Sequence, residues 1–226
     1  MKIPNESLMS LNKQLIDDLL SRITLVAVTK TQPIAAIKEL VKLGVKNIGE
    51  NKIQEFEGKY DEINNFLIEN NIEDVKFHFI GHLQSNKVSK AVEMFDVIQS
   101  TDSEKIAEKV NTAASEINKK IDVMIQVNIG KEEQKHGIMP EDVQEFYEKI
   151  KSFENINIIG LMCIAPDVGA EESRKYFKQM KQLKEKLNLK ELSMGMTQDY
   201  WIAIEEGATM VRLGRILYTK FDSCCG

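Results

Sequence analysis

Short apolar runs alternate along the chain with longer charged stretches in which apolar residues recur at helical spacing. The runs have the length of strands, and they predict eight of them, at 23–29, 45–49, 75–81, 96–100, 122–128, 156–164, 191–194 and 209–213. The charged stretches predict helices at 33–43, 51–70, 87–94, 103–118, 140–153, 169–187 and 197–206. Before the first strand, Leu8, Leu11, Leu15 and Leu19 predict an additional amphipathic helix.

Strands that alternate with helices are typical of βαβ units and a parallel sheet, which is an α/β fold. Eight strands favour a single closed (β/α)8 TIM barrel, and an open flavodoxin-like or Rossmann sheet remains the alternative. A barrel takes about 250 residues, with a lower limit of about 200. The 226 residues therefore suffice for one domain over 1–226 and leave no room for a C-terminal β domain. No G-x-G-x-x-G follows the first strand, which weakens a dinucleotide-binding interpretation.

Composition narrows the possible partners. Hydrophobic residues make up 42% of the chain and charged residues 29%, with a formal net charge of -5. No stretch is strongly basic, so we do not expect the protein to bind nucleic acid. No apolar run approaches the roughly 20 residues of a membrane helix, so we expect no membrane partner. The first residues are no secretory signal, which predicts a cytoplasmic protein. We interpret Cys224 and Cys225 as thiols of a frayed tail in a reducing compartment rather than a lipidation site, because no polybasic segment precedes them.

Conspicuous polar residues fall where the predicted strands end, and chemistry in a (β/α)8 barrel occurs at the carboxyl ends of the strands. These residues are Lys30, Glu50, Asn51, His82, Gln84, Asn128, Ser193 and Arg212.

Two of these strand ends predict a phosphate site. The segment 193–197 joins a strand to a helix, and its glycine, hydroxyls and helix N–H groups suit an anion. The alternative is an ordinary turn in which Thr197 caps the helix. Arg212 lies at the end of the last predicted strand, and Gly214 and Arg215 follow it. These residues suit a phosphate or a ring nitrogen, or else form a salt bridge at the rim. Loops after strands seven and eight often bind phosphate together.

Lys30 directly follows the first apolar strand. Its ammonium must reach solvent, pair with a charge or take part in chemistry, because an unpaired buried charge is costly. It is therefore either a rim lysine paired with Glu50 or an amine that condenses with an aldehyde.

Metal binding is not predicted. His78 and His82 are four residues apart, but they lie on a strand and a loop, where this spacing does not share a face, and no acidic or cysteine residue stands near them in the sequence. We interpret His136 as part of a mobile loop at 131–137 that forms a lid.

With these residues in place, the chain resembles the pyridoxal phosphate homeostasis protein family, also called proline synthetase co-transcribed homologues. The resemblance runs from about Val26 to Arg215, and the combination of motifs in this order is specific. The motifs are 27–30 (AVTK), 49–51 (GEN) with 54–55 (QE), 78–81 (HFIG), 83–87 (LQSNK), 160–162 (GLM), 193–197 (SMGMT) with Asp199, and 209–214 (TMVRLG).

The resemblance implies a fold-type III barrel like the amino-terminal domain of alanine racemase, which binds pyridoxal 5′-phosphate (PLP). It implies that Lys30 holds PLP as a Schiff base and that Arg212 faces the pyridine nitrogen. The phosphate would be held by Ser193, Gly195, Gly214 and the backbone of Arg215, with help from Thr197, and Asn51 would lie beside the cofactor.

The resemblance also implies a monomer that manages intracellular PLP, with PLP-dependent apo-enzymes as its partners, and no catalytic residue is assigned. The alternative is an amino-acid racemase or a related enzyme. Racemisation needs an acid or base on each face of the substrate. Lys30 can serve one face, and we expect Tyr218, the nearest tyrosine, to lie on the wrong side.

Overall fold

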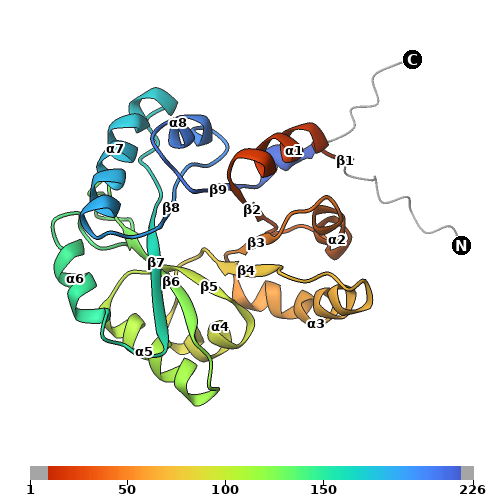
Figure 1. Cartoon of the computed structure of the whole chain (residues 1–226), viewed down its shortest axis with the longest axis horizontal. Coiled ribbons are helices and arrows are strands. Elements are labelled where there is room, and N and C mark those ends of the chain that lie inside the picture. Colours follow the sequence, from red (N-terminus) through yellow and green to blue (C-terminus); the bar gives the residue numbers. More distant parts are fainter. Residues whose placement is uncertain (1–9, 220–226) are drawn as a thin grey trace, which may run out of the picture.

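Eight parallel strands close into a barrel in the computed structural model, which describes residues 10–219. Helices surround the barrel (Figure 1). The predicted (β/α)8 barrel is confirmed, and the open sheet is wrong. The strands, in the order in which they pair, are β2 (Thr24–Val28), β3 (Asn47–Glu50), β4 (Lys76–Phe79), β5 (Val97–Thr101), β6 (Ile121–Val127), β7 (Ile156–Cys163), β8 (Glu191–Ser193) and β9 (Met210–Leu213), and β9 pairs with β2.

One helix connects each strand to the next. These helices are α2 (Ile34–Lys42), α3 (Ile53–Glu69), α4 (Val88–Met94), α5 (Glu104–Glu116), α6 (Val143–Ile150), α7 (Ala170–Lys186) and α8 (Tyr200–Glu205). Short 3-10 turns η1 (Ser85–Lys87) and η2 (Arg215–Leu217) precede α4 and follow β9. The largest differences from the predicted boundaries are at α6 and α8, which both begin three residues late. Because α8 begins at Tyr200 with Asp199 at its N-cap, the alternative role of Thr197 as a cap is wrong.

The additional N-terminal helix is α1 (Lys13–Arg22), which contains the predicted Leu15 and Leu19. Leu11 was expected in this helix, but it lies in β1 (Ser10–Leu11), which pairs antiparallel with β10 (Tyr218–Thr219). The helix cannot extend back to Leu11 because Asn12 caps it, with the Asn12 side chain accepting the N–H of Leu15 at 3.2 Å. Leu8 and the Cys224–Cys225 tail lie outside the described residues.

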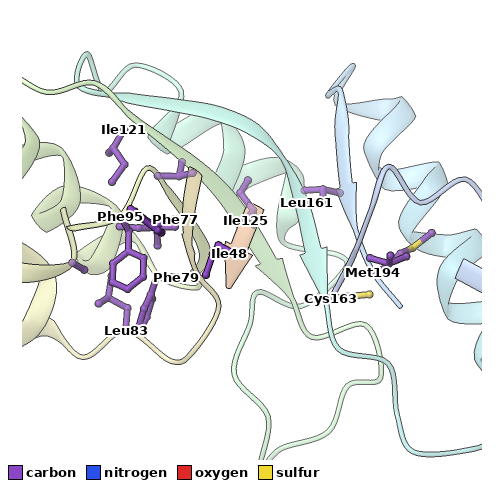
Figure 2. Packing of buried hydrophobic residues seen from close by; sticks show 14 of the residues in the cluster. Ile48, Phe77, Phe79, Leu83, Phe95, Ile121, Ile125, Leu161, Cys163 and Met194 are labelled. Carbon is purple, nitrogen blue, oxygen red and sulfur yellow. The ribbon is translucent and has the colours of Figure 1, made fainter. Parts of the chain in front are cut away.

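The main core lies between the strands and the helices (Figure 2). Alternate residues of each strand point outward, as Phe77 and Phe79 of β4 do, and a cluster of aromatic rings forms around them. The ring of Phe56 on α3 lies 5.0 Å from Phe77 and 4.9 Å from Phe95 between ring centroids. Each fully buried ring contributes roughly 1.5–3 kcal/mol. This core holds α3 and α4 against β4 and so positions the carboxyl-end loops of the neighbouring strands.

The barrel interior is more polar than the surrounding core. Four apolar side chains form a small cluster there: Val26, Met124, Met162 and Met210. Branched apolar residues usually fill the rest of such a barrel. Here buried polar side chains share the space, and they are His78, Gln99, Ser193 and Arg212.

Within residues 10–219, no helix is both long enough and apolar enough to span a bilayer.

Candidate functional site at the carboxyl-end rim

Two adjoining cavities open at the carboxyl ends of the strands, and their volumes are about 380 and 440 Å³. Both fall within the roughly 300–1,000 Å³ of small-molecule sites. The first reaches toward β3, β4 and the loop after β6, and the second toward the loops after β7, β8 and β9. The wall between them is shared, and its residues are Val28, Lys30, Lys135, Ile164, Met196 and Arg212. Predicted residues from the first and last barrel strands thus meet at one place.

Lys30 lies two residues beyond the end of β2 on an exposed turn. The next residue, Thr31, has a φ of 62°, which a β-branched side chain rarely adopts. The N–H of Thr31 donates to a carboxylate oxygen of Glu55 at 2.5 Å, and this contact holds the turn. The Lys30 ammonium therefore reaches solvent while its side chain lines both cavities.

Glu50 does not pair with Lys30, so the alternative of a rim ion pair between them is wrong. The Glu50 carboxylate is fully buried, accepts the hydroxyl of Thr29 at 2.7 Å, and lies 3.4 Å from the ammonium of Lys59. Burial raises the pKa of Glu50. Its neighbour Asn51 lines the first cavity, and the side-chain amide oxygen of Asn51 is buried without a hydrogen-bond partner in the described residues. That oxygen is an open acceptor for a ligand.

Arg212 on β9 is buried, and it lines both cavities. Its Nη1 donates to the carbonyl and the hydroxyl oxygens of Ser193 at 2.9 and 2.8 Å, and its Nη2 donates to the carbonyl of Cys163 at 2.8 Å. All three acceptors are neutral. Burial lowers the pKa of Arg212, although a guanidinium still stays protonated at any working pH.

Three of the five residues predicted to hold a phosphate line the second cavity. Thr197, Gly214 and Arg215 line it, so the structure brings these three residues together with Lys30. Asp199 also lines it, and burial raises the pKa of this carboxyl. The carboxyl of Asp199 accepts the N–H of Met196 at 2.7 Å, which fixes the turn before α8.

Ser193 and Gly195, which the resemblance assigned to the phosphate, lie away from the two cavities. Neither residue lines either cavity, and the Ser193 hydroxyl lies behind Arg212 in the barrel interior. Gly195 has a φ of 93°, and a Cβ there would stand 2.6 Å from the Cβ of Ala203. The glycine thus lets the turn after β8 pack tightly against α8, which places Thr197 at the cavity.

The loop after β6 closes one side of the first cavity and is tied to β6. The Asn128 side chain donates to the carbonyl of Glu132 at 2.9 Å and accepts the N–H of the same residue at 3.2 Å. The Gln126 side chain donates to the carbonyl of His136 at 3.0 Å. These contacts position Lys135, a cavity lysine that the sequence analysis missed, because nothing in the surrounding charged segment distinguishes it.

His82 has an acidic neighbour, contrary to the sequence expectation. Its Nδ1 lies 3.3 Å from a carboxylate oxygen of Asp102, and Nδ1 of His136 lies 3.8 Å from the same oxygen. Asp102 is twenty residues from His82 and approaches it only because β4 and β5 are neighbours. The two imidazole rings stack at 3.6 Å with an angle of 10°. An ion in the plane of one ring would thus stand far outside the plane of the other, which does not suit coordination by both.

An exposed lysine, a buried arginine and three residues of the predicted phosphate site thus lie together at the carboxyl-end rim of a (β/α)8 barrel, where barrels of this fold place their sites. Residues 7–220 match the family model of the alanine racemase N-terminal domain. The chain belongs to the pyridoxal phosphate homeostasis protein family. Proteins of that name from Aquifex aeolicus and Synechocystis are 38% and 37% identical to it, over 86% and 92% of this chain and 85% and 96% of theirs.

Solved structures agree with this assignment. PipY of Synechococcus elongatus with PLP bound has a TM-score of 0.80 and 34% sequence identity, covering 91% of this chain and 97% of its own. An alanine racemase from Clostridium difficile has a TM-score of 0.69 at 18% identity and shares the fold over 94% of this chain and 57% of its own.

Proposed function

We propose that this chain binds PLP and serves intracellular PLP homeostasis, with the cofactor held as a Schiff base on Lys30. One observation carries the proposal: Lys30 and Arg212 line the same two cavities, beside Thr197, Gly214 and Arg215. An amine, a cation for a ring nitrogen and an anion site match the aldehyde, pyridine and phosphate groups of PLP. The open acceptor of Asn51 also fits a hydroxyl on the ring. The relatives' names and the PLP bound to PipY support the same ligand.

The residues have separate roles in this proposal. Lys30 supplies the amine, Arg212 donates to the ring nitrogen, and Thr197, Gly214 and Arg215 hold the phosphate. Gly195 shapes the turn, and Ser193 acts behind Arg212. Bound PLP can stabilise a carbanion, but an arginine beside its nitrogen disfavours the protonated ring and makes it a poorer electron sink. The proposal further takes 1–226 as one domain, with a monomer in the cytoplasm and apo-enzymes as recipients.

Borohydride reduction of the purified protein after incubation with PLP should fix the cofactor covalently on Lys30, because reduction converts the carbon–nitrogen double bond into a stable amine. Peptide mass mapping locates the adduct. The variant Lys30→Arg keeps the positive charge but cannot condense, so it should give no adduct. Lys52→Arg, an exposed lysine outside both cavities, is the matched control and should react like the parent. An adduct that persists in Lys30→Arg would refute the assignment.

Racemase turnover is not expected, although the cavity is richer in titratable groups than the sequence suggested. The residues that line the two cavities include no tyrosine, and the hydroxyl of Tyr218 lies 3.5 Å from the carbonyl of Val28 in β2. His82, Lys135 and His136 do line the first cavity, so the missing tyrosine alone does not separate a carrier from an enzyme. The carrier proposal rests instead on Arg212.

Incubation of the PLP-loaded protein with L-alanine in deuterium oxide, followed by chiral analysis, tests this. We expect at most trace exchange at the α-carbon. Steady formation of the D-enantiomer at roughly 1–10³ per second, an ordinary enzyme rate, would establish the racemase instead.

A further inference from the structure

A row of buried polar side chains crosses the barrel interior behind Arg212. The Arg212 guanidinium donates to the hydroxyl oxygen of Ser193 at 2.8 Å. That hydroxyl in turn donates to the amide oxygen of Gln99 at 2.7 Å. The amide nitrogen of Gln99 lies 2.9 Å from Nδ1 of His78, and Nε2 of His78 lies 3.0 Å from the amide oxygen of Asn47. The row thus runs from the carboxyl-end cavities to a cavity at the opposite end of the barrel, which His78 and Asn47 line.

Every link in this row has a defined direction. An amide nitrogen can only donate, so Nδ1 of His78 must accept from Gln99. A neutral imidazole with an acceptor at Nδ1 carries its proton on Nε2, which then donates to Asn47. Burial supports the neutral form, because it lowers the pKa of His78 to about 3. Each donor therefore points away from Arg212 toward Asn47, and the acceptor ends of all the groups point toward the guanidinium.

The aligned row fixes both the position and the strength of the acceptor that Arg212 uses. Donation from the Ser193 hydroxyl to Gln99 polarises its oxygen and makes it a better acceptor, since hydrogen bonds in a chain reinforce one another. A fully satisfied buried network also restricts its members to one arrangement. Hydrogen bonds to Ser193 and Cys163 hold Nη1 and Nη2, so the guanidinium faces the two cavities in one orientation.

We propose that Gln99 and His78 are positioning residues, which act through Ser193 to present an N–H of Arg212 to the unprotonated ring nitrogen of a planar heteroaromatic ligand. This inference rests on the proposed PLP binding and adds two residues that do not line the PLP cavities. Polar residues in the barrel interior are otherwise difficult to explain, because apolar side chains pack there without any requirement for partners.

The row can be broken at its centre with Gln99→Met, which has a similar volume and no amide. The test measures the dissociation constants of PLP and of its 1-deaza analogue, in which a carbon replaces the ring nitrogen. The parent should bind PLP more tightly than the analogue. In Gln99→Met we expect PLP to bind about tenfold more weakly, which is typical for the loss of one hydrogen bond to a charged group. Binding of the analogue should change less than about twofold, because it offers no acceptor.

The matched control lies on the same strand. Thr101 is buried and its hydroxyl has no hydrogen-bond partner in the described residues, so Thr101→Val should leave both constants unchanged. Combining Gln99→Met with Arg212→Met should cause no further loss beyond that of Arg212→Met alone, because both changes remove the same contact. If Gln99→Met does not fold, His78→Leu breaks the next link, and His78→Asn restores an acceptor toward Gln99 and should recover binding.

Equal weakening of PLP and the analogue would show a structural role only and would overturn this inference, as would unchanged binding of both. In either case PLP binding by the parent would still stand. A parent that binds no PLP would overturn the proposed function and this inference together.

Discussion

The free energy of unfolding should fall by about 2 kcal/mol between pH 7 and pH 5 because of His78 alone, as estimated from the proton linkage of one histidine. Burial, with a smaller contribution from the charge on Lys76, lowers the pKa of His78 to about 3 in the folded protein. In the unfolded chain the same side chain titrates near about 6.5. Between these values the unfolded state binds a proton that the folded state excludes, so stability is full above the unfolded pKa and is lost as the pH falls.

Urea unfolding at half-unit steps of pH measures the slope of the free energy of unfolding against pH. The variant His78→Asn keeps an acceptor for Gln99 and has no proton to bind, so its slope should be shallower by the predicted amount whatever its absolute stability. Thr101→Val, which changes a buried side chain without removing a titratable group, is the control and should keep the same dependence on pH. Glu50 and Asp199 have raised pKa values and act in the opposite direction, but they are the same in all three proteins. Parallel curves for the parent and His78→Asn would disprove the buried neutral histidine.

Gly160→Ala should destabilise the protein by about 2–4 kcal/mol, in the range of severe overpacking. Gly160 lies in β7 beside Glu191 of β8. A Cβ at position 160 would stand 2.1 Å from the carbonyl oxygen of Glu191 and 2.6 Å from its carbonyl carbon. Both atoms belong to the backbone of a neighbouring barrel strand, so neither can rotate aside, and the two strands would have to separate.

The same substitution at Gly58 provides the control with the opposite sign. Gly58 lies on the exposed side of α3, and no heavy atom lies within 4 Å of the position its Cβ would take. Gly58→Ala should therefore stabilise the protein by roughly 0.5–1 kcal/mol through helix propensity and reduced freedom of the unfolded chain. Denaturant midpoints with unchanged slopes report both effects. A Gly160→Ala protein as stable as the parent would mean that β7 and β8 do not approach so closely.

The barrel could be predicted because each apolar run and each helical face is a local pattern. These patterns predict eight strands, and eight parallel strands alternating with helices favour a sheet that closes into a barrel. The pairing of β1 with β10 could not be predicted in this way. It joins two-residue strands from opposite ends of the described chain, and segments this short carry no periodicity.

The part of the site that lies at strand ends could also be predicted from the sequence. Lys30 and Gly214 follow strands and Arg212 lies near the end of one, and a barrel brings strand ends together whatever the details of packing. The proximity of Asp102 to His82 depends on which strands are neighbours, and the position of Lys135 at the cavity depends on contacts from Asn128 that shape a loop. The position of Ser193 behind Arg212 depends on the alternation of side chains in β8, since one residue along the strand decides between the barrel interior and the outer core.

The closure of the barrel also determines when the site can exist during folding. Lys30 follows the first barrel strand and Arg212 lies in the last, and these strands, β2 and β9, pair with each other. Contacts so distant in sequence form against a large loop-closure entropy and are slow to form. A nascent or partly folded chain can therefore assemble the outer aromatic core around β4 while the two halves of the cavity are still apart. Ligand binding then reports completion of the whole barrel rather than of any part of it.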